Sequence, residues 1–155
     1  MVFKYRVRFS SLHVSKGNRY RAPYKAVMLL AILELVEHGM IKDNRFTFSD
    51  DLVDACSHIW DRYISVETVL LKDFTNPFWY MKSESFWNLY HNDGSMVSSS
   101  ERKPSEAILR TGYYGEFDEE LFRLLSDSKC RSVLRVTLIS KYLEPITSSY
   151  MGDVR

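Results

Sequence analysis

The chain has 155 residues, a length at which one domain can bury its own core. Its two cysteines lie far apart outside any CxxC pattern and its longest apolar run covers only residues 26–33, which argues against a disulfide scaffold, a zinc site and a membrane span. Its 21 basic and 20 acidic residues nearly cancel, yet seven of the basic residues and none of the acidic ones lie within the first 25 positions.

The first 39 residues predict one ambiguous segment followed by one helix. Residues 2–14 fit a strand by alternation and a helix by the spacing of Tyr5, Phe9 and Leu12, and the pattern leaves both open. After a turn at residues 16–18, Pro23 opens a helix that runs to about His38 and stops at Gly39, with apolar residues on all sides. We therefore expect that helix to be central and buried.

The next segments predict a short extended piece at residues 46–48 and a helix capped by Ser49, whose first turn carries Asp50 and Asp51. Two aromatic runs, residues 78–81 and 86–90, are separated by the polar residues 82–85, which predicts a β-hairpin.

The last third predicts a flexible loop over residues 93–100, a helix capped by Asp118, and a final helix over residues 129–143 that Pro145 ends. The fold class expected is α+β: a mainly helical single domain, residues 1–145, with a small antiparallel hairpin or sheet, winged-helix-like in outline. Residues 146–155 read as a tail, or as a linker toward a nuclease domain that this chain lacks.

Catalytic chemistry is not evident in the chain, so binding is favoured over turnover and the enzyme class stays open. The four histidines are scattered, and Cys56-x-His58 lacks the further ligands that a metal site needs. No cofactor is expected. A basic edge on an otherwise acidic domain favours nucleic-acid phosphate as partner, with a solvated basic terminus as the alternative.

Six blocks of the sequence stand out: Arg21-Ala22-Pro23-Tyr24-Lys25 before a leucine-rich helix, Asn44-Arg45, Trp60, Pro77-Phe78-Trp79, Ser83-Glu84-Ser85-Phe86-Trp87-Asn88-Leu89, and residues 118–125. Together they resemble the sulfur-binding domain of phosphorothioate-dependent restriction endonucleases, over residues 5 to about 143. The family's usual APHKP is Ala22-Pro23-Tyr24-Lys25-Ala26 in this chain. The resemblance favours the helical alternative for residues 3–13.

The resemblance implies a function and a set of site residues. The family binds DNA in which sulfur replaces a non-bridging phosphate oxygen, and the domain commonly precedes an HNH nuclease domain. The partners implied are therefore double-stranded phosphorothioate DNA and a nuclease domain in cis or in trans. The implied residues are Arg19, Arg21, Tyr24 and Lys25 for phosphates, and Asn76, Pro77, Phe78 and Tyr80 for the sulfur pocket. As basic residues, Arg102, Lys103 and Arg110 are expected to close the pocket from the other side or to contact DNA.

Physical chemistry supports such a pocket, because sulfur is more polarizable and more weakly hydrated than oxygen and gains dispersion energy in an apolar cup. Three alternatives stay open. They are a winged-helix DNA-binding domain without sulfur specificity, a protein-interaction adaptor, and a nuclease in its own right.

Overall fold

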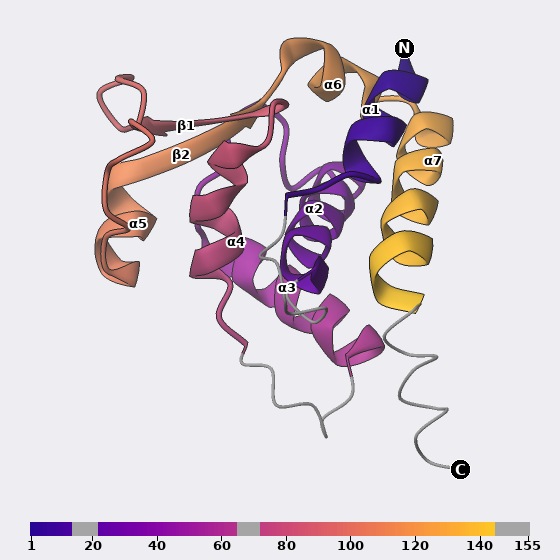
Figure 1. Cartoon of the computed structure of the whole chain (residues 1–155), viewed down its shortest axis with the longest axis horizontal. Coiled ribbons are helices and arrows are strands. Elements are labelled where there is room, and N and C mark those ends of the chain that lie inside the picture. The colour runs from indigo at the N-terminus through magenta and orange to yellow at the C-terminus, as the bar shows by residue number, and fades with distance from the viewer. Residues whose placement is uncertain (14–21, 65–71, 145–155) are drawn as a thin grey trace.

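The computed structural model describes residues 1–13, 22–64 and 72–144 (Figure 1). The predicted turn at residues 16–18, Pro145 and the tail 146–155 lie outside the described residues. The elements in chain order are α1 (Val2–Phe9), α2 (Ala22–Glu37), α3 (Asp50–Tyr63), α4 (Thr75–Tyr80), the 3-10 turn η2 (Met81–Ser83), β1 (Trp87–His91), α5 (Glu106–Gly112), β2 (Tyr113–Phe117), α6 (Glu119–Leu124), α7 (Ser128–Leu138) and the π-helical turn η3 (Ile139–Leu143).

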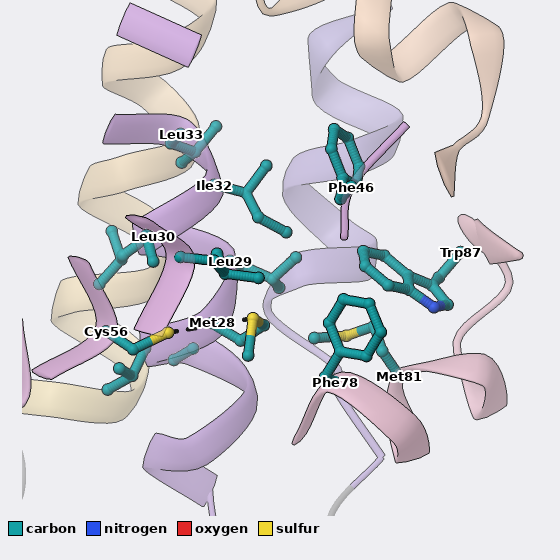
Figure 2. Close-up of a cluster of buried hydrophobic side chains, with 14 of the residues drawn as sticks. Met28, Leu29, Leu30, Ile32, Leu33, Phe46, Cys56, Phe78, Met81 and Trp87 are labelled. Carbon is teal, nitrogen blue, oxygen red and sulfur yellow. Dashed lines mark hydrogen bonds between the residues drawn. The ribbon is translucent and has the colours of Figure 1, made fainter. Parts of the chain in front are cut away.

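Helix α2 is the centre of the core, as its uninterrupted apolar sequence predicts. Every residue from Ala26 to Leu33 is buried, and the helix packs against α3, α4, α7 and η3. Figure 2 shows its side chains meeting aromatic residues of the sheet and of α4, including Phe78 and Trp87. Gly39 ends the helix with a φ of 73°, and Met40 N donates to Leu35 O at 2.9 Å. The predicted helix and its stop are confirmed.

Helix α1 settles the ambiguity in the first segment in favour of a helix. It buries Tyr5 and Phe9, the two residues that are one helical turn apart, and packs against α7. Beyond its end, Tyr142 Oη donates to Phe9 O at 2.7 Å and accepts from Leu12 N at 2.9 Å. The last predicted helix is α7 continued by η3, and it begins one residue early because Asp127 caps it by accepting from Lys129 N.

The predicted hairpin over residues 78–90 is wrong in its first strand. Residues 75–83 form α4 and η2, and β1 instead pairs antiparallel with β2, from Trp87 opposite Phe117 to His91 opposite Tyr113. Residues 92–112, including α5, join the two strands, so no tight-turn wing is formed. Phe74, Phe78 and Met81 are buried on one side of α4 and η2. Aromatic runs of this length fit a short buried helix as well as a strand, and tertiary packing decides between them.

The predicted extended piece at residues 46–48 pairs with one edge of the sheet. Phe46 and Gly115 exchange two backbone hydrogen bonds of 2.8 Å. A Cβ atom at position 115 would overlap the Trp87 ring, which explains the glycine in the middle of β2. Asn44 extends the edge further, because its side-chain amide donates to Phe117 O and accepts from Phe117 N.

Helix α3 begins where predicted, with Ser49 Oγ accepting from Leu52 N. Asp118 occupies the N-cap position of α6 as predicted, but its carboxylate makes no capping bond and instead accepts from Tyr5 Oη and Arg8 Nη1. The mainly helical α+β class with one small antiparallel sheet is confirmed. Among the described residues, no helix is long and apolar enough to cross a membrane.

Candidate nucleic-acid interface

The short helix α4 presents two of the predicted pocket residues to solvent. Asp73 sets its start, because Asp73 Oδ1 accepts from Thr75 N at 3.0 Å and from the Thr75 hydroxyl. Pro77 is tolerated in the first turn, where its missing N–H costs no helical hydrogen bond. Asn76 and Tyr80 lie four residues apart on the exposed face, and Tyr80 is 52% exposed.

Lys103 joins this face from a distant part of the chain. Its ammonium donates to Thr75 Oγ1 at 3.1 Å and also to Asn76 Oδ1. The lysine lies just before Pro104 and Ser105, and Ser105 caps α5. The loop before α5 and the Ser105 cap therefore together place the Lys103 ammonium at the start of α4. We call Asn76, Tyr80, Ser83 and Lys103 the α4 surface.

Ser83 connects the α4 surface to the two ends of the basic segment that residues 14–21 occupy in the sequence. Lys25 Nζ donates to Ser83 Oγ at 2.9 Å and to Glu84 Oε2 at 2.6 Å. On the other side of that segment, His13 N donates to Glu84 Oε2 at 2.8 Å. Ser83 Oγ in turn donates to Tyr80 O at 3.0 Å. His13 and Lys25, which flank the basic segment in the sequence, therefore both bond to the Ser83–Glu84 pair at the end of η2.

A network of titratable side chains holds the loop that carries Arg102 and Lys103. Glu101 accepts from Tyr113 Oη at 2.7 Å, and His91 Nε2 lies 2.9 Å from its other oxygen. Burial raises the pKa of Glu101, but the hydrogen bonds from Tyr113 and His91 outweigh burial and the net shift is downward. Burial and the bond to Glu101 raise the pKa of Tyr113 to about 12. Glu101 is therefore a carboxylate that fixes the loop at neutral pH.

Lys82 is a cation beside the α4 surface that sequence reasoning missed. Its ammonium lies 3.9 Å from the centre of the Trp79 ring and 3.5 Å from Ser98 O. Burial lowers the pKa of Lys82, and the nearby Glu101 carboxylate opposes that shift. The prediction of a strand at residues 78–81 and a hairpin connection at residues 82–85 hid this cation. Helical spacing of Asn76, Tyr80 and Ser83 would have placed all three on one face.

The structure separates the other predicted residues. Arg19 and Arg21 lie outside the described residues. Tyr24 is half-buried with its ring 5.1 Å from that of Trp60, and Arg110 pairs with Asp50 at 2.7 Å. Lys25 is buried in its ion pair with Glu84, so its ammonium is not on the surface.

Within the predicted sulfur pocket, Pro77 and Phe78 are buried beneath the α4 surface, while Asn76 and Tyr80 are exposed. Phe78 packs against Phe48 and Trp87 in the core. Arg102 is exposed. The structure therefore brings together Asn76, Tyr80 and Lys103, and the chemistry they offer is an ammonium, an amide and an exposed aromatic ring.

Part of the predicted basic N-terminal edge is paired with acidic residues of the same chain. Lys4 pairs with Glu120 at 2.8 Å and Arg8 with Asp118 at 3.4 Å, so the acids at the start of α6 neutralise two of its cations.

The described part of the chain contains no group of three or more His, Cys, Asp or Glu side chains that could hold a metal ion. Compared with known proteins, the sequence matches no family model and no curated protein.

Proposed function

We propose that this domain binds double-stranded DNA carrying a phosphorothioate linkage, as the targeting module of a modification-dependent HNH restriction endonuclease. The observation that carries the proposal is the meeting of two predicted segments on one surface. Asn76 and Tyr80 belong to the first segment, and Lys103 reaches Asn76 from the second, 27 positions further along the chain. Lys25 supports this surface from inside the protein, because its buried ammonium donates to Ser83 Oγ.

The α4 surface suits a modified phosphate for two reasons. The Lys103 ammonium supplies charge for the remaining oxygen and for neighbouring phosphates. The exposed Tyr80 ring supplies a polarizable apolar contact for sulfur, which loses less hydration than oxygen on burial. Pro77 and Phe78 lie beneath and would touch sulfur only after a local rearrangement, so we assign the first contact to Tyr80.

In this proposal cleavage belongs to a nuclease domain in cis or in trans, and the protein works in the cytoplasm. A reducing compartment suits its two cysteines, which are unpaired in the described residues. The alternative hypothesis with most support is a DNA-binding domain without sulfur specificity, since Lys103 would contact a phosphate of plain duplex equally well.

Substitutions on the α4 surface separate sulfur reading from phosphate binding. We expect Tyr80→Ser to remove most of the preference for modified over plain duplex while plain-duplex affinity changes little. We expect Lys103→Ala to weaken both duplexes alike and to reduce the slope of log affinity against log salt by about 0.9, because one phosphate contact is lost. Fluorescence anisotropy with labelled duplexes at a series of salt concentrations measures both quantities.

The chain offers matched controls. Met40 is 54% exposed, close to the exposure of Tyr80, and Lys129 is an exposed lysine on α7. Met40→Ser and Lys129→Ala should leave affinity, salt slope and preference unchanged. If Lys103→Ala behaves like Lys129→Ala, the α4 surface is not the DNA contact. If Tyr80→Ser keeps the full preference, sulfur is read elsewhere.

A further inference from the structure

Helices α1 and α7 form an exposed groove that the α4 surface does not include. The groove has a volume of about 660 Å³, and its apolar lining comes from Phe3 and Val7 on α1 and from Val133 and Val136 on α7. These four belong to the nine large hydrophobic side chains exposed in the described residues, with Phe3 63% and Val136 60% exposed. Exposed apolar residues are therefore concentrated in this groove.

The spacing of the lining residues shows that each helix has two apolar faces. Helix α1 buries Tyr5 and Phe9 and turns Phe3 and Val7, also four residues apart, toward the groove. Helix α7 buries Leu134 and Leu138 and turns Val133 and Val136 outward. Two packed helices that share an outward apolar stripe can pack against a third helix, as in a helical bundle.

Three of the four hydroxyl side chains that line the groove donate their hydrogen bonds to backbone carbonyls one turn earlier in the chain. Ser10 Oγ donates to Val7 O, Thr137 Oγ1 to Val133 O and Ser140 Oγ to Val136 O. The groove thus offers apolar contact rather than polar recognition.

Charge at the groove identifies the kind of partner. Three basic residues of α1 and α7 outside the groove have acidic partners within the chain: Lys4 pairs with Glu120, Arg8 with Asp118 and Arg135 with Glu37. The two cations that line the groove, Arg6 and Lys141, have no acidic partner among the described residues, and no acid lines the groove there. A docked segment with acidic residues beside its apolar stripe would complete the pairing.

We propose that the α1–α7 groove docks an amphipathic helix of another protein or domain, with an apolar stripe flanked by Asp and Glu. The lining from α7 and η3, residues 132–141, spans about 14 Å, so roughly three turns of the partner helix would lie in the groove. In Figure 1, α5, which follows Lys103 in the chain, lies at the opposite side of the molecule from α7, so the groove is a different surface from the one proposed for DNA. The inference goes beyond the proposed DNA binding and does not depend on it.

Two labelled synthetic peptides test the proposal with the full chain. Both have leucines at helical spacing over about four turns; in one the flanking positions are Glu, and in the other they are Lys. We expect the Glu peptide to bind at least about ten-fold more tightly than the Lys peptide, with a difference that shrinks as salt is added. Joint replacement Arg6→Glu and Lys141→Glu should invert the order.

Substitutions in the groove supply the decisive comparison. Val136→Asp and Val7→Asp place a charge on the apolar lining at exposed positions and should each weaken the Glu peptide at least about ten-fold. Ile108→Asp, at an exposed position on α5, is the matched control and should change nothing. Equal affinity for the two peptides, or unchanged binding in both groove variants, overturns the proposal. Self-association of the chain that Val136→Asp abolishes would assign the groove to a second copy, and competition by plain duplex would assign it to nucleic acid; either result also overturns it.

Discussion

Replacing Glu84 with alanine is expected to lower the free energy of unfolding by about 3–5 kcal/mol. Glu84 is 5% exposed and is the acidic partner of Lys25, whose ammonium lies 2.6 Å away and is itself buried. Without the carboxylate, the Lys25 charge stays buried and uncompensated, and His13 N loses its acceptor. Chemical denaturation followed by tryptophan fluorescence measures the change.

Glu119→Ala is the matched control for this variant. Glu119 pairs with Arg123 on the surface of α6, where both side chains are exposed, and such a pair contributes less than about 1 kcal/mol. The double replacement Lys25→Met and Glu84→Leu should recover most of the stability lost in Glu84→Ala, because no unpaired charge remains. A loss below about 1 kcal/mol for Glu84→Ala would contradict the buried pair and would leave Lys25 available to contact phosphate.

Replacing Leu30 with alanine is expected to cost about 2–5 kcal/mol of unfolding free energy. Leu30 is buried in the middle of α2, the helix that α3, α4, α7 and η3 surround (Figure 2). The substitution loses the favourable free energy of transferring the deleted side-chain atoms from water into the core. It also leaves a cavity, because the surrounding helices cannot all move inward to fill it. The thermal midpoint should fall well below that of the parent protein.

Ile108→Ala serves as control for Leu30→Ala, since Ile108 is 55% exposed in α5 and its loss should change stability by no more than about 0.5 kcal/mol. Similar unfolding energies for the two variants would mean that α2 is not the centre of the core.

The parts of the fold that local sequence decides could be predicted. Helix α2 carries apolar residues on every side and stops at a glycine with positive φ, and α3 begins at a serine that caps it. These signals depend on neighbouring residues alone, so contacts with distant parts of the chain do not change them.

The parts that depend on distant contacts could not be predicted. The aromatic run from Phe78 to Met81 fits a strand or a buried helix, and only packing on α2 makes it helical. The partner of β1 is β2, which lies beyond a loop and a helix, and nothing near β1 identifies it. Because of this error, the sequence did not predict that Asn76 and Tyr80 share one exposed helical face.

Side-chain pairing was equally hidden within the candidate site. Lys25 follows Pro23 in the first turn of a helix, where a cation can reach a phosphate, but Glu84 lies 59 residues further along and binds it inside the protein. Lys103 was predicted only as one of three basic residues that could close the pocket or contact DNA, and its position on Asn76 follows from how the loop before α5 folds back onto α4.

Affinity of the parent protein for one duplex in three forms tests the central claim most directly. The forms are plain duplex and the two phosphorothioate diastereomers at a single linkage, compared at one fixed salt concentration. A sulfur contact of about 1–3 kcal/mol predicts that one diastereomer binds about five-fold to more than a hundred-fold more tightly than the other two forms. Equal affinity for all three forms would contradict sulfur recognition and would leave a DNA-binding domain that reads only phosphate charge and shape.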